Sequence, residues 1–185
     1  MLAPQPVTLT RGRVSLEPWT QAHDADLLRA ASPTVFRWLP TFSPTTLEEV
    51  AAIRESHPGL AWAVVVDGKA SGSTSYLDVD TELGGLEIGW TWYGEDLWAT
   101  DVNPTCKLLL LAYAFEELGA GRVLLKTDAL NARSRAAIGK LGCAYDGTLR
   151  HHRLRPDGSV RDTAFFSMLA AEWPVAKQRL LHRLG

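Results

Sequence analysis

The sequence contains few of the residues that build metal centres or disulfide frameworks. Only two of its 185 residues are cysteines, Cys106 and Cys143, and neither a CxxC nor an HExxH pattern occurs. Zinc sites and disulfide-rich folds need several such ligands at set spacings. The sequence therefore predicts no bound metal, and it predicts two small cysteines that are buried as apolar residues.

Long apolar runs and blocks of like charge are also missing. The longest apolar run is 108–115, which is too short to span a bilayer. The N-terminus lacks the basic region and apolar core of an export signal, so we expect a cytoplasmic protein with no membrane partner. Lysines and arginines number 19 against 21 acidic residues, a net charge of −2. That balance argues against a nucleic-acid partner, which usually binds a basic surface.

The chain has the composition of an ordinary folded protein, with 46% hydrophobic and 22% charged residues. Its length suits one domain with a well-buried core. We find no internal repeat, low-complexity stretch or linker, and we therefore expect residues 1–185 to form a single domain.

The first half of the chain is expected to form a strand, two helices and three further strands. Apolar residues alternate loosely over 7–16, which predicts a strand, and they recur at helical spacing over 22–31. A second helix is expected from Thr45 or Thr46, with two glutamates in its first turn. The three strands are predicted at 60–66, 69–79 and 86–92, with the turn Asp67-Gly68 joining the first two.

The second half alternates between helices and strands. Asn103 is expected to cap a buried helix that has Pro104 at its first position and ends at Gly119. Asn131 is expected to cap the next helix, which ends near 140–142. The remaining elements are predicted as a strand at 122–127, a hairpin of strands 148–154 and 160–168, and a last helix from about Pro174. Together these elements predict an α+β fold with a mixed sheet of about seven strands.

The segment 33–44 is aromatic and shows no regular period. Two interpretations are open for it. It lines a substrate cleft, or it is a loop that packs on its own core.

Several motifs resemble those of the GCN5-related N-acetyltransferase (GNAT) family, in the family's order and over nearly the whole chain. The run 86–92, then Val102-Asn103 and Lys107-Leu-Leu-Leu, is similar to the family's central region. The next family motif is matched by Lys126-Thr-Asp128, Asn131, 134–138 and 140–142. The tail from Arg155-Pro-Asp-Gly158 through Arg161-Asp-Thr163 to Glu172-Trp173 resembles the branch of ribosomal-protein N-terminal acetyltransferases.

The resemblance implies a central sheet whose fourth and fifth strands splay apart to hold acetyl-CoA, with no metal. It implies that the pyrophosphate rests on amides of the loop before the long central helix, since a helix N-terminus favours anions. The cofactor contacts that it implies are Trp90, Thr91 and Trp92 on the strand, Ala99, Thr100, Asp101, Val102 and Asn103 in the loop, and Asn131 and Ser134.

Asp101 is the main departure from the family pattern, because it stands where the family's phosphate loop has its first glycine. A carboxylate about 5 Å from a pyrophosphate charge costs roughly 3 kcal/mol at an effective dielectric of about 20. Two outcomes are open. The carboxylate turns to solvent and costs little, or it occupies the amide nest and weakens or prevents cofactor binding. The second outcome would make the chain a degenerate relative that binds a ligand or partner without catalysis.

For acetyl transfer to a primary amine, we expect Glu87 to act as the general base and Ser134 to supply the thiol proton. Each residue also has a structural interpretation, Glu87 as a bonded carboxylate and Ser134 as a helix-end residue. Tyr145 is an alternative proton donor. The acceptor, either a protein N-terminus or a small amine, is not specified by the sequence. The oligomeric state is also left open, a homodimer included.

Overall fold

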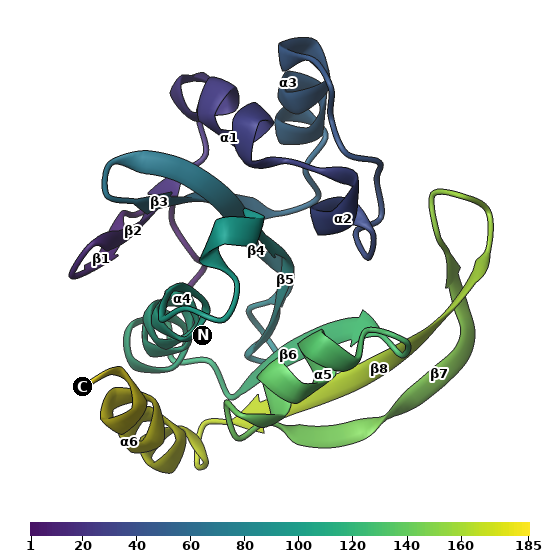
Figure 1. Cartoon of the computed structure of the whole chain (residues 1–185). Helices are drawn as coiled ribbons and strands as arrows, with labels where there is room; N and C mark the ends of the chain where they lie inside the picture. Colours follow the sequence, from purple (N-terminus) through teal and green to yellow (C-terminus); the bar gives the residue numbers. More distant parts are fainter.

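The structure is a computed structural model that describes residues 1–185, and its centre is one mixed sheet of eight strands (Figure 1). The strand order is β1-β2-β3-β4-β5-β6-β8-β7, and only the β5–β6 pair is parallel. The strands are β1 (Leu9–Arg11), β2 (Val14–Pro18), β3 (Leu60–Val66), β4 (Lys69–Asp80), β5 (Gly85–Tyr93), β6 (Arg122–Asp128), β7 (Ala144–Leu154) and β8 (Val160–Leu169). The predicted α+β class with a mixed sheet is confirmed.

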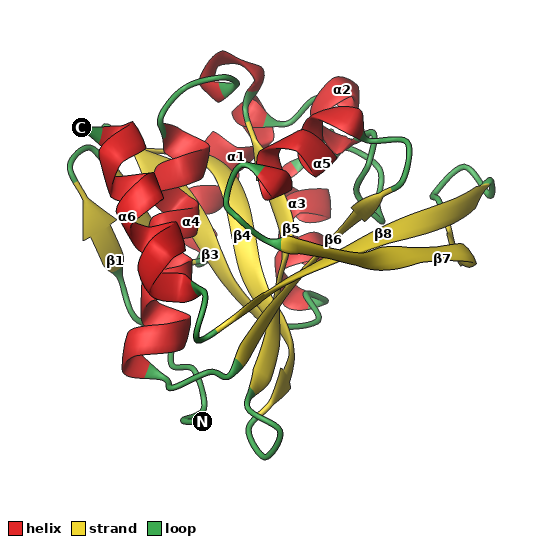
Figure 2. Ribbon diagram, turned by 90° about the horizontal axis from the view of Figure 1, so that it is seen from below, coloured by secondary structure: helices red, strands yellow, loops and turns green.

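Helices cover both faces of this sheet. The helices are η1 (Gln21–His23), α1 (Asp24–Ala30), α2 (Pro33–Phe36), α3 (Leu47–Glu55), η2 (Glu95–Leu97), α4 (Val102–Ala112), η3 (Tyr113–Glu117), α5 (Ala132–Gly139) and α6 (Trp173–Leu184). In Figure 2, α4 and α6 lie side by side on one face, while α1 and α3 lie on the other. No helix has both the length and the apolar character that crossing a membrane requires.

The two faces are built by strands that are apolar on both sides. In β3, Trp62, Val64 and Val66 point into the core under α4 and α6. Ala63 and Val65 point into a smaller core under α1 to α3. This is the alternation of a strand that is buried on both faces.

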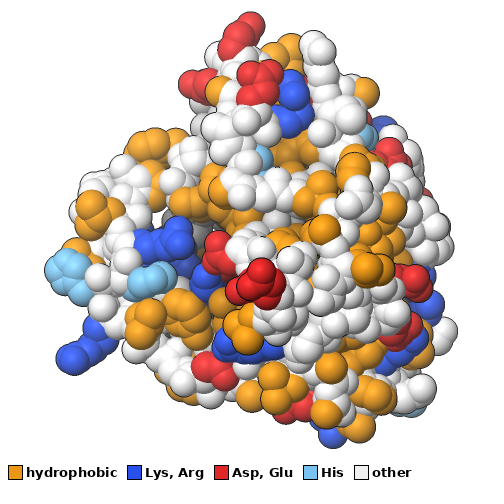
Figure 3. Space-filling model, turned by 180° about the vertical axis from the view of Figure 1, so that it is seen from behind, with side chains coloured by type: hydrophobic (Ala, Val, Ile, Leu, Met, Phe, Trp, Pro, Cys, Tyr) orange, Lys and Arg blue, Asp and Glu red, His pale blue; other side chains and the backbone are white.

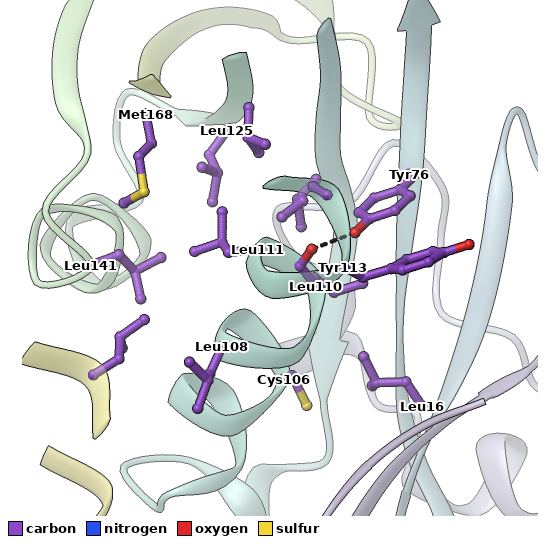
Figure 4. Close-up of a cluster of buried hydrophobic side chains, with 14 of the residues drawn as sticks. Leu16, Tyr76, Cys106, Leu108, Leu110, Leu111, Tyr113, Leu125, Leu141 and Met168 are labelled. Atoms are coloured by element: carbon purple, nitrogen blue, oxygen red, sulfur yellow. Dashed lines mark hydrogen bonds between the residues drawn. The ribbon is translucent and has the colours of Figure 1, made fainter. Parts of the chain in front are cut away.

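Helix α4 lies at the centre of the larger core, as its nearly all-apolar sequence predicts. Figure 4 shows Leu111, Leu125, Leu141 and Met168 gathered on one side of it. On its other side, the Tyr76 hydroxyl donates a hydrogen bond to the carbonyl oxygen of Leu110. The helix then loosens into the π-helical turn η3, and Gly119 follows at φ 70°, the left-handed conformation expected just beyond a helix end.

The elements depart from prediction in four places. The expected strand at 7–16 is two strands, because Gly12 (φ 58°) reverses the chain in a hairpin, so the sheet has eight strands instead of about seven. The expected irregular segment 33–44 begins with the short helix α2, which Ser32 caps. Strand β7 starts at Ala144, earlier than expected. Helix α4 begins at Val102, so Asn103 lies inside its first turn and is not its cap.

The close approach of β4 to β5 leads to a stability prediction. A Cβ added at Gly72 would lie 2.3 Å from the carbonyl oxygen of Trp92, a backbone atom that cannot move aside. We expect Gly72→Ala to lower the free energy of unfolding by about 1–3 kcal/mol. Gly139, at the end of α5, has open space around it. Gly139→Ala is therefore the matched control, and it is expected to stabilise by about 0.5–1 kcal/mol. Urea denaturation measures both changes, and a neutral Gly72→Ala would contradict the close approach.

Candidate functional site

Strands β5 and β6 pair along only part of their length and then separate. Their parallel register covers Gly85–Ile88 against Arg122–Leu125 and ends there. Beyond Ile88, β5 stays paired with β4 on one side and has no strand partner on the side turned to β6. The splay expected between the strands predicted at 86–92 and 122–127 therefore lies between β5 and β6. It leaves backbone groups of β5 facing the gap.

A β-bulge at Trp90 marks the start of the separation. Trp90 has φ 50°, which is unusual for a bulky residue, and the β4–β5 register shifts by one residue there, between Ser75↔Gly89 and Ser73↔Trp92. A one-residue shift reverses which face each later side chain points to. Ile88 points toward α4 before the bulge, whereas Thr91 and Tyr93 bond residues of α4 after it.

A cavity of about 560 Å³ occupies the gap and continues to the opposite face of the sheet. Its walls come from β5, from the loop and first turns of α4, and from β6 and α5. Trp38, Leu39 and Pro40 close one side of it, which supports the cleft interpretation of the aromatic segment 33–44. Pro58 and residues beside the turn of the β7–β8 hairpin, 153–155, Arg161 and Thr163, line its far end.

The loop that leads into α4 presents unpaired amides to this cleft. Ala99 has φ 61°, and the amides of Ala99 and Asn103 donate to no acceptor within the protein. The loop is fixed by the Trp98 indole, which donates to the carbonyl oxygen of Tyr93 (3.0 Å), and by the Thr100 hydroxyl, which donates to that of Leu97 (2.7 Å). Free amides at the start of a helix form an anion-binding arrangement.

The carboxylate of Asp101 points away from these amides. It accepts a hydrogen bond from Arg13 (2.8 Å), which also pairs with Asp67 (3.3 Å). The Arg13 guanidinium holds the pKa of Asp101 below its ordinary value. Asp101 itself has φ −72°, so this position does not need the left-handed conformation of a glycine. The geometry corresponds to the first of the two outcomes considered for Asp101, with a basic partner in addition to solvent.

Helix α5 forms the wall opposite this loop. Its cap is Asn131, as predicted, because the Asn131 side chain accepts a hydrogen bond from the Ser134 amide (3.0 Å). The Ser134 side chain lines the cleft and makes no hydrogen bond within the protein. Arg133 reaches across to the α4 loop, where its guanidinium stacks 3.5 Å from the centroid of the Trp98 ring. Arg133, Lys140 and Arg183 make this end of the cleft cationic, with no carboxylate among its lining residues.

Lys107 of α4 is a buried cation within the same cleft. It is 5% exposed, and its ammonium donates to the Thr91 hydroxyl (2.9 Å), which bonds that of Thr74 (2.8 Å). No carboxylate pairs with it, and burial lowers its pKa to about 8. A lysine on a helix ordinarily extends into solvent, but Lys107 is buried. The signal that could have identified it is a single charge inside a helix that is otherwise apolar all round.

A charged network occupies the far end of the cleft. The carboxylate of Glu87 lies 2.6 Å from the ammonium of Lys126, which also pairs with Asp78 at 3.0 Å. Burial raises the pKa of Glu87 despite the attraction of Lys126. Asp78, which is more exposed, has its pKa lowered by the hydrogen bond from Lys126. Glu87 is thus a carboxylate that exchanges a proton at a higher pH than an exposed one.

The structure brings most of the predicted site residues into one cleft. Its lining includes Glu87, Trp90, Thr91, Trp92, Ala99, Thr100, Asn103, Asn131 and Ser134. Two predicted cofactor contacts lie outside the lining, since Asp101 is turned to Arg13 and the Val102 side chain is buried in the core. The alternative proton donor Tyr145 also lies elsewhere, exposed on β7 and bonded to Thr148.

Comparisons with known proteins agree with this geometry. The family model described as "Acetyltransferase (GNAT) domain" matches residues 13–144. A solved GCN5-related N-acetyltransferase from Brucella melitensis is 30% identical, with a TM-score of 0.93 over 98% of this chain and 87% of the other. YdaF of Bacillus subtilis, provisionally named a ribosomal N-acetyltransferase, is 25% identical over 85% of this chain and 90% of its own.

RimJ of Mycobacterium smegmatis, solved in complex with CoA-disulfide, shares the fold at 20% identity. Its TM-score is 0.79, over 96% of this chain and 95% of the other. With a matching family model over most of its length, the chain belongs to the GNAT acetyltransferase family and is an acetyl-CoA-dependent N-acetyltransferase.

The Arg13–Asp101 pair leads to a prediction about cofactor affinity. Arg13→Gln removes the partner that draws the Asp101 carboxylate away from the loop. Acetyl-CoA is then expected to bind several-fold more weakly, because an unpaired negative charge lies beside the anion-binding amides. Arg13→Gln/Asp101→Asn, which removes the charge as well, is expected to restore the affinity. Calorimetric titration measures all three proteins, and equal affinities throughout would show that the carboxylate has no influence on binding.

The burial of Lys107 leads to a prediction about stability and pH. Its pKa falls from 10.5 to about 8 on folding, so below about pH 8 the charged form costs about 3 kcal/mol of folding free energy. Between about pH 8 and 10.5 the unfolded state binds more protons, and stability therefore rises with pH. Lys107→Met is expected to be more stable at pH 7 and to lose this rise. Denaturation curves at pH 7, 9 and 10 test this, with the exposed Lys69→Met as the control.

Proposed function

We propose that this enzyme acetylates the primary amine of a protein N-terminus or of a small molecule by direct attack on acetyl-CoA. The observation that carries the proposal is the difference in charge between the two ends of a single cleft. One end has free amides and unpaired cations without carboxylates, and the other end has the buried carboxylate of Glu87. The name of YdaF supports an amine on a ribosomal protein.

The cationic end fits the phosphates of CoA. The amides of Ala99 and Asn103 and the positive end of α4 would hold the pyrophosphate. Arg133 and Lys140 add charge at the same end. The structure of RimJ with CoA-disulfide supports a CoA site in this fold. Acetyl-CoA supplies a thioester whose carbonyl carbon an amine can attack.

Beyond the bulge, the unpaired edge of β5 lies where the acetyl group would be oriented. Backbone groups of 89–92 can bond the pantetheine arm in the way that a neighbouring strand would. The ammonium of Lys107 donates a hydrogen bond to Thr91 in this part of β5. It provides positive charge for the carbonyl oxygen, which becomes negative during attack.

Glu87 is the proposed general base. As the amine nitrogen bonds the carbonyl carbon, Glu87 takes a proton from that nitrogen, directly or through one water molecule. The carbon–sulfur bond then breaks, and the proposed proton donor to the leaving sulfur is the Ser134 hydroxyl, which regains a proton from solvent as Glu87 releases the one it took. The unpaired hydroxyl of Ser134 in the cleft supports this assignment.

Release of free thiol from acetyl-CoA in the presence of amine peptides tests the proposal. Glu87→Gln is expected to lower kcat about a hundredfold or more. The exposed Glu82→Gln is the matched control and is expected to keep wild-type kcat.

A base functions only when it is deprotonated, so activity should fall as pH falls through the raised pKa of Glu87. That acid limb should be absent from the residual activity of Glu87→Gln. A variant with unchanged kcat and the same acid limb as the wild type would remove Glu87 from the mechanism.

A further inference from the structure

Two arginines at the far end of the cleft have no acidic partner. Arg153 of β7 and Arg161 of β8 lie directly opposite each other in the antiparallel pair, and both line the cavity. The guanidinium of Arg161 bonds only the Thr163 hydroxyl, through Nε at 3.1 Å, and Arg153 makes no side-chain bond. Like charges directly opposite across two strands destabilise the pair. This arrangement therefore carries an electrostatic cost that Asp128 and Glu87, which attract Arg161 from beyond ion-pair distance, offset only in part.

The other two cations at this end are already paired. Arg155 binds Asp128 in a bidentate ion pair, at 2.7 Å through Nε and 3.1 Å through Nη2. Lys126 lies between Glu87 and Asp78. Burial, with the positive charge of Arg153 adding to it, holds the pKa of Arg161 below its ordinary value. An incoming anion would find two guanidinium groups without a direct ion pair, since Asp78, Asp128 and Glu87 act on them only at longer range.

These arginines lie on the same side of the sheet as Glu87. Along β8, every second side chain lies on the same face, and this face carries Arg161, Thr163 and Phe165. The ammonium of Lys126 lies 5.5 Å from the centroid of the Phe165 ring and also pairs with Glu87. Ala164 and Phe166 point to the opposite face, into the core under α4. In Figure 3, basic side chains and histidines gather on the lobe formed by the β7–β8 hairpin, beside a hollow with acidic side chains at its edge.

The position of this pair separates it from the site proposed for the cofactor phosphates. Those phosphates have the α4 amides and Arg133, Lys140 and Arg183 at the other end of the cavity. Arg153 and Arg161 instead flank the place where the acceptor amine would meet Glu87. An acceptor bound there would place its amine at the carboxylate of Glu87 and a negatively charged group at the two guanidinium groups.

We propose that Arg153 and Arg161 bind a carboxylate that the acceptor carries close to its reacting amine. This rests on the proposed function, acetylation of an amine beside Glu87. Paired guanidinium groups match a carboxylate with parallel hydrogen bonds. Two sources supply the same chemistry, a peptide whose second or third residue is acidic and a free amino acid with its own α-carboxylate.

Matched acceptors test the proposal. The peptides Ala-Glu-Ala-Ala-amide and Ala-Gln-Ala-Ala-amide differ only in charge, and so do alanine and alaninamide. Thiol release from acetyl-CoA gives kcat/KM for each. We expect the charged member of at least one couple to be preferred about tenfold or more, mainly through KM. The couple that shows the preference identifies the source of the carboxylate.

The arginines are then tested by substitution. Arg153→Gln/Arg161→Gln is expected to bring the ratio of kcat/KM between charged and neutral acceptors close to one, and Arg161→Lys to keep part of it. Arg150→Gln is the matched control, since Arg150 is exposed on the same strand outside the cavity, and it should keep the full ratio. Thermal unfolding confirms that each variant is folded.

Two results would overturn the proposal. One is a wild-type enzyme that acetylates both members of each couple equally well. The other is a double variant that retains the full preference. Failure of the proposed function is distinct from both, since it would leave every acceptor without thiol release, charged or neutral.

Discussion

The loss of pairing between β5 and β6 after four residues is the constraint on which the rest of the site depends. Parallel strands normally continue their hydrogen bonds to the end of the shorter one, but here Ile88 and Leu125 are the last partners. The bulge at Trp90 turns the exposed edge of β5 and reverses the faces of its later side chains. Separation of the strands thereby opens the cavity and exposes the backbone groups that line it.

The charges along the cavity follow from that separation. Before the bulge Ile88 points toward α4 and Glu87 to the opposite side, whereas after it Thr91 bonds Lys107 of α4. The carboxylates that line the cavity lie at one end, and the free amides and unpaired cations of the α4 end lie at the other. A donor that carries phosphates and an acceptor that carries an amine can therefore approach from opposite faces of one sheet.

Local signals in the sequence predicted much of the fold. Alternation over 86–92, the cap at Asn131 and the stop at Gly119 each depend on residues within one turn or strand, and the family motifs add the splay. Sequence patterns leave open the features that distant residues decide. Asp101 is oriented by Arg13, 88 positions away, and Lys107 is buried by elements on every side of α4. The pairing of Arg153 with Arg161 depends on an irregular register in the β7–β8 hairpin, which no local pattern specifies.

The ion pair between Arg13 and Asp101 joins the hairpin formed by β1 and β2 to the loop that starts α4. Through it, the order of an N-terminal hairpin and the occupancy of an anion site become thermodynamically linked. An anion bound at the proposed site would strengthen hairpin docking by the same factor by which hairpin docking strengthens anion binding. These outermost strands of the sheet would thus contribute to the free energy of binding at the proposed cofactor site, although none of their residues lines the cleft.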